Sequence, residues 1–345
     1  MNERVERLRA SLDEPLLVTS SCNVLYLTGF DSSNAAVLVE PNRVRLFSDF
    51  RYAEAARAVE GVEFTQTERN LFGSLAERLE GRVAFEATSV SYAAYETLAG
   101  GSAELVPRRG LVERLRAVKD AGELDAIRRS AAVTDEAFER LAEEPFLGRT
   151  EEELAWRMFE LLREAGSDAV AFPIIVATGA NAARPHAKPG DRVVEPGHTV
   201  IVDTGAQVDA YCSDCTRTFA AGPLADELKR AYAVCREAQE AGLRAVRAGV
   251  AARDADGAAR RVIDDAGFGE AFGHGLGHGL GLDVHEAPGL RPESDAVLEA
   301  GNVVTVEPGI YLPGAGGVRI EDLVVVTEGD PEVLSTFTKE LVTVE

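Results

Sequence analysis

The chain has 345 residues, enough for two domains with buried cores, and 46% of them are hydrophobic, as in an ordinary globular protein. Fifty-eight acidic against 36 basic residues give a formal net charge of -22, which disfavours binding to nucleic acids and to anionic membranes. The longest nearly apolar run, residues 169–177, is far shorter than the roughly 20 residues of a membrane span, so no membrane helix is expected.

The N-terminal sequence and the composition also predict the cellular location of the protein. The N-terminus, MNERVERLRASLDEP, has alternating charges where a secretory signal has an apolar segment, and four cysteines do not suggest a disulfide framework. We therefore expect a cytoplasmic protein. The acid excess with only four lysines predicts a halophilic surface, adapted to a salt-rich cytoplasm. A GC-rich genome, which favours Arg over Lys, is the alternative.

The first hundred or so residues predict a small α/β domain. Four β-like runs (LLVTS, NVLYLTGF, AAVLVE and VRLFSDF) alternate with helical patterns such as RYAEAARAV. From Gly110 to Glu144 apolar residues recur at helical spacing among Glu and Arg, which predicts a helical connector. We place the domain boundary near residue 118, which gives domains 1–118 and 119–345.

The second domain alternates predicted helices with β-like runs. The helices are expected around residues 151–165, 224–247 and 254–266. Trp156, the only tryptophan, lies in the first of them and is expected in the core or in an interface. Cys212 and Cys215 form a C-x-x-C without a second pair, so we interpret them as incidental thiols.

A first predicted hairpin carries two aspartates. In TVIVDTGAQVDAYCSDCTRTF, Asp203 and Asp214 are equidistant from the point between Val208 and Asp209, so as hairpin partners they would face each other. Asp209 is expected to form the turn. Like charges directly opposite on two strands are destabilising, and the apolar flanks suggest partial burial. A cation is therefore expected between the two carboxylates.

A second hairpin repeats the pattern with glutamates. In VVTVEPGIYLPGAGGVRIEDLVVVT, Glu307 and Glu321 are equidistant from Gly314, and Asp322 should point to the opposite strand face from Glu321. Two such hairpins predict the halves of a pseudo-symmetric sheet. Two divalent cations would neutralise four carboxylates, and oxygen ligands with one imidazole suit Mn, Co, Fe or Zn. Acids that flank turns and face water are the alternative.

The segment FGHGLGHGLGLDVHE, residues 272–286, holds three of the five histidines and alternating glycines. His274 and His278 have the spacing of a helical zinc motif, but so many glycines disfavour a helix. A phosphate loop lacks the strand-to-helix context. We expect an extended segment in which His274, Leu276, His278 and Leu280 share one face, and glycines allow a close approach on the other. His274 either lines the pocket or is structural.

These motifs resemble one peptidase family. The residues Asp203, Asp214, His278, Glu307 and Glu321 stand in VDTGA, SDCTRTF, GHGLG, VEPG and RIED. Over residues 119–345 this order resembles the pita-bread metallopeptidases, which include Xaa-Pro dipeptidases (prolidases), aminopeptidases P and methionine aminopeptidases. NVLYLTGF and SDFRYAEAA resemble the N-terminal domain of the proline-specific branch and of creatinases. The resemblance implies an α/β (α+β) protein, with a small creatinase-like α/β domain before a pita-bread catalytic domain of pseudo-twofold symmetry.

The resemblance also implies a dinuclear metal site. Asp214 and Glu321 would bridge two divalent ions, Mn or Co by preference and Zn or Fe otherwise. Asp203 would bind mainly one ion, and His278 and Glu307 the other. A water between the ions would attack the scissile carbonyl, and Glu307 would move its proton towards the leaving nitrogen.

Four more residues are candidates for binding substrate. His186 matches the family's substrate-side histidine, and His285 matches the histidine that hydrogen-bonds the substrate and steadies the tetrahedral intermediate. Arg319 either pairs with a substrate carboxylate or orients Glu321. Tyr211, next to the metal strand, either contacts a ligand oxygen or packs.

The function implied is hydrolysis of the peptide bond before proline by an Xaa-Pro dipeptidase. Its partners would be small peptides with proline in second place, and the family-level expectation is a homodimer. An Xaa-Pro aminopeptidase for longer peptides and a non-peptidase hydrolase of a small amide or osmolyte are the alternatives. A pseudoenzyme is disfavoured because all five ligand positions are filled.

Overall fold

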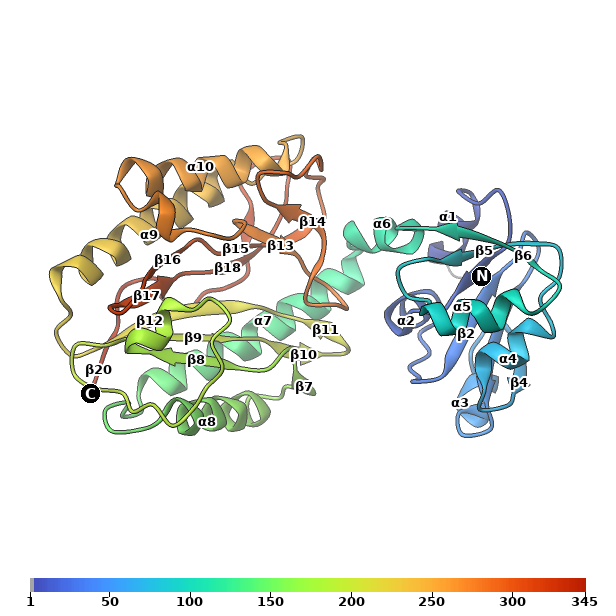
Figure 1. Cartoon of the computed structure of the whole chain (residues 1–345), viewed down its shortest axis with the longest axis horizontal. Helices are drawn as coiled ribbons and strands as arrows, with labels where there is room; N and C mark the ends of the chain where they lie inside the picture. The colour runs from blue at the N-terminus through green and yellow to red at the C-terminus, as the bar shows by residue number, and fades with distance from the viewer. Residues whose placement is uncertain (1–2) are drawn as a thin grey trace. The chain divides into compact units, whose positions relative to one another are not determined.

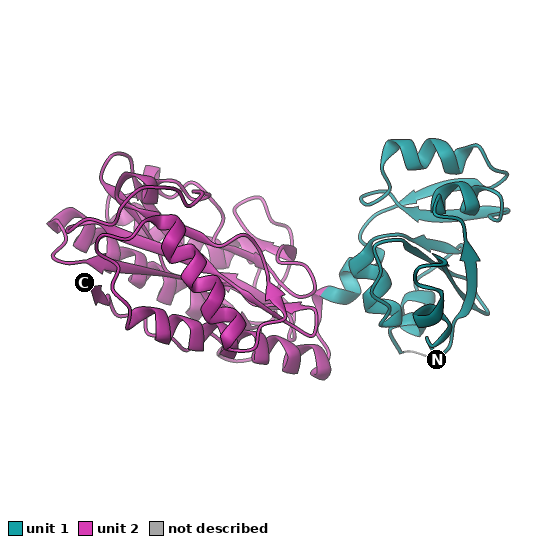
Figure 2. Cartoon of the chain, turned by 90° about the horizontal axis from the view of Figure 1, so that it is seen from below, with its two compact units in different colours: residues 1–116 teal, residues 117–345 magenta. Residues whose placement is uncertain are grey.

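The computed structural model describes residues 3–345, and the chain divides into two compact units, residues 1–116 and 117–345 (Figure 2). Each unit has its own sheet structure and its own hydrophobic clusters. None of the helices within residues 3–345 is both long and apolar enough to cross a membrane.

Unit 1 is built on one six-stranded sheet. Its strands are β1 (Leu16–Val18), β2 (Ala35–Val39), β3 (Val44–Asp49), β4 (Glu63–Thr67), β5 (Arg82–Glu86) and β6 (Glu104–Arg108). Its helices are α1 (Glu3–Arg9), α2 (Ser21–Thr28), α3 (Ala53–Arg57), α4 (Leu71–Ala76) and α5 (Tyr92–Ala99). The order β4-β3-β2-β1-β5-β6 mixes antiparallel and parallel pairs. The small α/β domain predicted here is confirmed.

One predicted strand of unit 1 is wrong. The run NVLYLTGF forms most of helix α2 and its C-terminal cap. The helix ends at Gly29, which has a φ of 70° and whose N–H donates to the Leu25 carbonyl at 2.7 Å. Glycine adopts this left-handed conformation at little cost, so it caps helices well. A short apolar run is compatible with a helix or a strand. Here the glycine cap at its C-terminal end is the feature that indicates a helix.

The predicted connector is helical but interrupted. It consists of α6 (Leu111–Ala117) and α7 (Ala121–Ala142). Asp120 is the N-cap of α7: its carboxylate accepts from the Glu123 N–H at 2.9 Å, and the Glu123 carboxylate accepts from the Asp120 N–H at 3.0 Å. This reciprocal capping starts α7 at Ala121.

Unit 2 alternates helices with strands, as predicted. After α7 its α-helices are α8 (Glu151–Glu164), α9 (Asp226–Ala245) and α10 (Ala252–Asp265). The strands of its first half are β7 (Ala169–Val170), β8 (Ile175–Thr178), β9 (Thr199–Thr204), β10 (Ala206–Val208), β11 (Tyr211–Cys212) and β12 (Cys215–Ala221). Those that follow are β13 (Gly277–Gly279), β14 (Glu286–Leu290), β15 (Val303–Val306), β16 (Gly309–Leu312), β17 (Gly316–Arg319), β18 (Asp322–Val325), β19 (Glu332–Val333) and β20 (Thr343–Val344).

The two halves of unit 2 have similar construction. One half packs α7 and α8 on the sheet β20-β12-β9-β8, and the other packs α9 and α10 on the sheet β14-β13-β15-β18-β19. Figure 1 shows the two helix pairs on opposite sides of the strands. Each half contains an antiparallel pair, β9 with β12 or β15 with β18, and the predicted carboxylates lie in these strands or directly beside their ends.

The first hairpin has a different register from the predicted one. Asp203 lies opposite Thr216 rather than Asp214. The turn is formed by Asp209 and Ala210, whose φ values of 49° and 68° are both left-handed, so the hairpin centre lies one residue later than expected. The turn role of Asp209 is confirmed, and the two aspartates are diagonal neighbours.

The second hairpin has the predicted register. Val306 lies opposite Asp322 on one side of the glutamates, and Gly309 lies opposite Arg319 on the other. Both pairs are centred on Gly314, whose φ is 84°. Glu307 therefore lies opposite Glu321.

The glycine-rich segment is extended at β13, Gly277–Gly279, and bends at residues 281–285, and its glycines make close contacts with backbone. A Cβ at Gly277 would lie 2.0 Å from the Thr305 carbonyl oxygen, and one at Gly279 would lie 2.3 Å from that of Ala287. Only glycine allows the flanking strands to approach this closely. Leu276 and Leu280 are fully buried in two separate hydrophobic clusters.

The remaining structural predictions have mixed outcomes. Trp156 is 63% exposed and contacts Phe159 with ring centroids 5.4 Å apart, so the core alternative is wrong. Trp156 lies on the solvent-facing side of amphipathic α8. Helical periodicity predicts the helix but does not by itself show that this tryptophan lies on the exposed side. Cys212 and Cys215 are free thiols buried in different clusters, which supports their incidental role.

Candidate metal centre and active site

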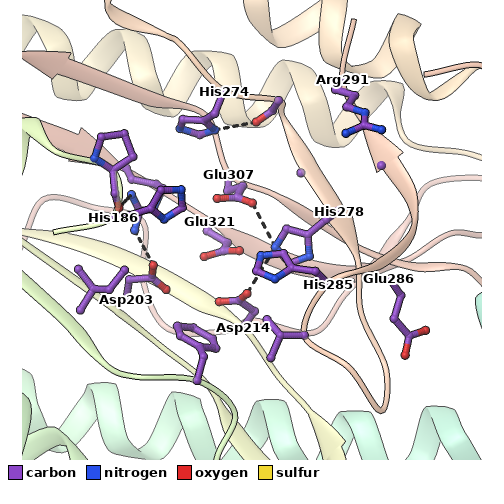
Figure 3. Close-up of a pocket in the computed structure, with 18 of the residues that line it drawn as sticks. His186, Asp203, Asp214, His274, His278, His285, Glu286, Arg291, Glu307 and Glu321 are labelled. Atoms are coloured by element: carbon purple, nitrogen blue, oxygen red, sulfur yellow. Dashed lines mark hydrogen bonds and ion pairs between the residues drawn. The ribbon is translucent and has the colours of Figure 1, made fainter. Parts of the chain in front are cut away.

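Four carboxylates from the two hairpins meet in one pocket of about 740 Å³ in unit 2. Asp203 lies in β9, Asp214 immediately precedes β12, Glu307 follows β15 and Glu321 precedes β18. Figure 3 shows Glu321 between Glu307 and Asp214, with Asp203 to one side. The structure therefore brings together the four acids that sequence symmetry singled out.

Three oxygens of this cluster are buried without a protein partner. Among residues 3–345, nothing hydrogen-bonds to Asp203 Oδ1, Asp214 Oδ1 or Glu321 Oε1. Burial raises the pKa of Asp214 and of Glu321 well above the usual range, and neighbouring carboxylates raise both further. Burial also raises the pKa of Glu307. Unpaired buried carboxylates are costly, so this cluster requires protons or cations.

The donor set fits a divalent metal ion. Asp214, His278 and Glu321 each offer one ligand atom, and these atoms all lie within 4.8 Å of one another. Carboxylate oxygens with one imidazole nitrogen are ligands typical of Mn, Co, Fe and Zn. A cation held by these ligands would give the buried oxygens a partner.

His278 is oriented for such a site. Its Nε2 lies 3.4 Å from Glu307 Oε1 and 3.6 Å from Asp214 Oδ2, while Nδ1 lies 3.1 Å from the Gly279 carbonyl oxygen. A proton on Nδ1 would donate to that carbonyl and leave the Nε2 lone pair directed at the carboxylates. Burial lowers the pKa of His278, which favours the neutral ligand form.

Arg319 is committed to protein groups around the carboxylates. It donates to Asp203 Oδ2 at 2.5 Å and to Thr216 Oγ1 at 3.1 Å, and Thr216 Oγ1 donates to Glu321 Oε2 at 2.7 Å. Its other contacts are the Tyr311 hydroxyl and the Pro185 carbonyl. Of the two predicted roles, this geometry supports orientation of carboxylates, with Asp203 as the direct partner and Glu321 reached through Thr216.

The other three histidines of the prediction also line the pocket. The His285 ring centroid lies 4.3 Å from that of His278. The His285 side chain is exposed at the pocket wall, but the groups around the ring exclude part of its water, and this partial desolvation lowers the pKa of His285. His186 is exposed and follows Pro185 in the pocket wall. His274 Nε2 lies 2.9 Å from the Tyr311 hydroxyl, which joins it to Arg319. His274 therefore both lines the pocket and belongs to the network that holds Asp203.

Tyr211 is the one candidate that the structure does not bring to the pocket. Its hydroxyl donates to Glu123 Oε1 at 3.0 Å, and the ring packs on a hydrophobic cluster. Asp322 points away from the carboxylates, as predicted, and its carboxylate accepts from three buried or partly buried donors: Arg217, Gln239 and Lys339.

Sequence reasoning missed several residues of this pocket. Arg291 lines it with an exposed side chain that makes no ion pair with any described residue. Phe172 and Ile175, from the run AVAFPIIVA, form an apolar part of the lining. Arg291 stands in GLRPES, where no motif marked it, whereas the apolar run could have indicated a buried wall.

Comparisons with known proteins identify the family of the chain. Residues 125–328 match the model of metallopeptidase family M24, and residues 4–118 match that of the creatinase/prolidase N-terminal domain. The chain is 31% identical to the Xaa-Pro dipeptidase of Pyrococcus furiosus over 353 aligned positions, covering 99% of this chain and 100% of the relative.

Solved structures give the same result. An Xaa-Pro dipeptidase from Bacillus anthracis superposes with a TM-score of 0.94 at 38% identity, covering 99% of both chains. An X-Pro aminopeptidase from Thermotoga maritima superposes with a TM-score of 0.89 at 34% identity, covering 99% of this chain and 100% of the other. The predicted fold, a creatinase-like domain before a pita-bread domain, is confirmed. The chain therefore belongs to metallopeptidase family M24, in the branch of prolidases and aminopeptidases P.

Proposed function

We propose that this metallopeptidase hydrolyses the peptide bond before proline in Xaa-Pro dipeptides and that it uses two divalent cations. The observation that carries the proposal is the convergence of four acids and one imidazole, with three buried oxygens that have no partner among residues 3–345. The full-length similarity to proteins named Xaa-Pro dipeptidase supports the substrate class.

The cations would be held by the two hairpins and the glycine-rich segment. Asp214 and Glu321 would bridge both ions, Asp203 would bind one, and His278 and Glu307 the other. Bound cations would supply Lewis acidity and lower the pKa of water at the site. Mn or Co suits the four carboxylates and single imidazole, and Fe or Zn is the alternative.

Glu307 is suited to carry a proton. Its carboxylate lines the pocket, with Oε1 3.4 Å from His278 Nε2, and a carboxylate in this position can exchange a proton with a bound substrate. The Thr305 hydroxyl donates to Glu307 Oε1 at 3.2 Å and fixes its orientation. Glu307 would take a proton from the attacking water and deliver it to the proline nitrogen.

His285 and His186 would contact the substrate. Both are exposed side chains in the pocket wall, and either imidazole can donate a hydrogen bond to a carbonyl oxygen. His285 would stabilise the oxygen on which negative charge develops, which is where such a bond accelerates the reaction most. Arg319 would hold Asp203 in place.

Arg291 and the apolar lining would select a dipeptide. The unpaired guanidinium of Arg291 is suited to the free carboxylate of an Xaa-Pro dipeptide, because arginine binds carboxylates with two parallel hydrogen bonds. Phe172, Ile175 and Val284 provide apolar contacts for the proline ring and the preceding side chain. A bond to proline has no N–H and a fixed φ, so it requires its own pocket.

An Xaa-Pro aminopeptidase for longer peptides is the second candidate, because the Thermotoga maritima structure named X-Pro aminopeptidase superposes over the whole chain. The deciding experiment measures metal content and compares hydrolysis of Ala-Pro and Ala-Pro-Ala, with Mn or Co, by wild type and Asp214→Asn. We expect about two ions per chain and preference for Ala-Pro, with both lost in Asp214→Asn. Asp209→Asn, at the exposed turn of the same hairpin, is the control.

Two other outcomes of this assay would favour a different function. Preference for Ala-Pro-Ala would indicate the aminopeptidase. Failure of the metal-loaded protein to cleave any Xaa-Pro peptide would favour the non-peptidase hydrolase of a small amide or osmolyte. We also propose a cytoplasmic homodimer, with the exposed Trp156 and Phe159 of α8 as a contact to examine by light scattering of Trp156→Glu.

A further inference from the structure

Glu151 is a buried carboxylate that lies outside the metal site. It is the first residue of α8 and is 1% exposed. Its two oxygens accept from three neutral donors: the Thr178 N–H at 2.8 Å, Asn181 Nδ2 at 2.9 Å from each oxygen, and the Gly190 N–H at 3.2 Å. A buried carboxylate requires hydrogen bonds of this kind, which are stronger than those between neutral groups. Glu151 therefore forms a fixed junction between separate backbone segments.

The three donors lie at the two ends of one loop. Thr178 is the last residue of β8, and Asn181 follows shortly after it. Gly190 lies beyond His186, which lines the pocket. We call residues 179–190 the His186 loop, with Thr178 and Asn181 at its near end and Gly190 at its far end. One carboxylate thus joins the near end of the loop to the far end.

Backbone hydrogen bonds hold the far end of the His186 loop to α8 independently of this side chain. The Glu152 N–H donates to the Gly190 carbonyl at 3.1 Å, and the Glu151 N–H donates to the Arg192 carbonyl at 3.0 Å. The Glu151 carboxylate adds the near end, where two of its three donors lie. A change of this side chain should therefore loosen the near end and leave the backbone contacts of α8 in place.

The middle of the His186 loop is held from the side of the metal ligands. Arg319, which also donates to Asp203, donates through Nη1 to the Pro185 carbonyl at 3.2 Å. Figure 3 shows His186 and His285 on opposite sides of the carboxylates. The His186 side chain is exposed, so its place in the pocket depends on the backbone of the loop rather than on packing around the ring.

We infer that Glu151 is a positioning residue for His186 and acts by joining the two ends of the His186 loop. Glutamine in its place has one acceptor oxygen and one NH2 group, so its NH2 would face a donor of the loop. The near end would then shift, and His186 with it. The effect on catalysis rests on the proposed function, in which His186 contacts the substrate, whereas the position of the ring does not.

A double-mutant cycle with His186 tests the effect on catalysis. Glu151→Gln should lower kcat/KM for Ala-Pro about 10- to 100-fold, as expected when a group that contacts substrate is displaced by up to about 1 Å. In the His186→Ala background the same change should cost at most about twofold, because the residue that Glu151 positions is gone. A general structural defect would lower kcat/KM by the same factor with or without His186, and that result would overturn the inference.

Imidazole NMR of the metal-free protein tests the position of the ring without any assay of activity. Labelling His Cε1 gives a signal for each of the five histidines, and His186→Ala identifies that of His186. Glu151→Gln should move this signal. Glu152→Gln, at the next residue of α8, whose side chain is exposed, is the matched control and should leave the signal in place. An unmoved His186 signal in folded Glu151→Gln would overturn the inference.

Asn181→Ala keeps the test decisive if Glu151→Gln fails to fold. This variant removes one donor at the near end and leaves the Glu151 carboxylate bonded to the Thr178 and Gly190 N–H groups, so it should fold. It should move the His186 signal by a smaller amount, and a wild-type signal would overturn the inference. Absence of Ala-Pro hydrolysis by metal-loaded wild type would contradict the proposed function instead, and the NMR result would still decide the role of Glu151.

Discussion

Arg319 donates to Asp203 Oδ2 at 2.5 Å, whereas Asp203 Oδ1 is buried without a partner among residues 3–345. One oxygen of this carboxylate is thus assigned to the protein and the other is directed into the pocket. The buried guanidinium fixes the rotation of the carboxylate, and it also reaches Glu321 through Thr216. Partners of this kind set the orientation and basicity of metal ligands.

Replacement of Arg319 by Met should weaken metal binding. Asp203 would lose its charged donor, and we expect about a 10- to 100-fold loss of Mn affinity at one site, with a similar loss in kcat/KM. Calorimetric titration of the metal-free protein measures the affinity. Arg244→Met, at an arginine whose side chain is 67% exposed, is the control and should bind Mn normally. Wild-type affinity in Arg319→Met would show that Asp203 needs no such support.

Asp214→Asn should stabilise the metal-free protein and abolish stabilisation by metal. Asp214 is buried among Glu321, Asp203 and Glu307, and these charges raise its pKa together with burial. The amide removes that repulsion, so Tm in EDTA should rise above wild type. In wild type, Mn at about 100 times its Kd should add about 2.7 kcal/mol, and in the variant much less. Thermal unfolding in EDTA and in Mn measures both effects. A Tm of Asp214→Asn below that of wild type in EDTA would contradict the expected stabilisation of the metal-free protein.

The metal-free protein should lose stability as the pH rises through neutrality, relative to Asp214→Asn. Burial raises the folded-state pKa of Asp214 and Glu321 above unfolded values near 4. A carboxyl of this kind stabilises the fold below its unfolded pKa, and that contribution is lost as pH rises through the folded pKa. The expected slope is about 1.4 kcal/mol per pH unit for each extra proton bound by the folded state.

Urea unfolding in EDTA between about pH 5 and pH 8 measures this difference. With Mn present the trend should reverse, because the ligands must lose protons to bind metal. Parallel pH profiles for wild type and variant in EDTA would mean that the carboxylates share no protons in this range.

The two carboxylate pairs show what the sequence could and could not predict. Glu307 and Glu321 were placed correctly because their hairpin is symmetric about Gly314, a residue suited to the turn. For Asp203 and Asp214 the same reasoning gave the wrong register. Their turn includes Ala210 at a φ of 68°, and alanine gives no sign of a left-handed conformation. Both pairs still reach the pocket. In the first hairpin, the shift of the turn by one residue leaves Asp203 and Asp214 as diagonal neighbours on the two strands.

Contacts between distant segments could not be predicted. The Lys119–Glu286 pair and the Tyr311 hydroxyl between His274 and Arg319 depend on tertiary packing that leaves no local pattern. The strand predicted at helix α2 and the core alternative for Trp156 are wrong for a related reason. A short apolar run does not show whether the segment is a helix or a strand, as in α2. A helical period does not show which side of the helix is buried, as at the exposed Trp156.

Arg291→Gln should weaken selection for dipeptides. If the guanidinium binds the substrate carboxylate, KM for Ala-Pro should rise by about tenfold or more, as expected from loss of a charge-assisted hydrogen bond of about 1.5–3 kcal/mol. KM for Ala-Pro amide, which lacks the carboxylate, should change little. Steady-state kinetics on this matched pair separates the carboxylate contact from a general defect. An equal rise for both substrates would exclude Arg291 as the carboxylate partner.

Salt should stabilise the protein if its acidic surface is an adaptation. A net charge of -22 causes self-repulsion, and the screening length falls from about 10 Å at 0.1 M salt to about 3 Å at 1 M. We therefore expect partial unfolding in low salt that is reversed by molar KCl. Circular dichroism against KCl concentration measures it, and sucrose, which strengthens burial without screening charge, is the control. A Tm that responds to KCl no more than to sucrose would favour genome composition as the origin of the scarce lysines.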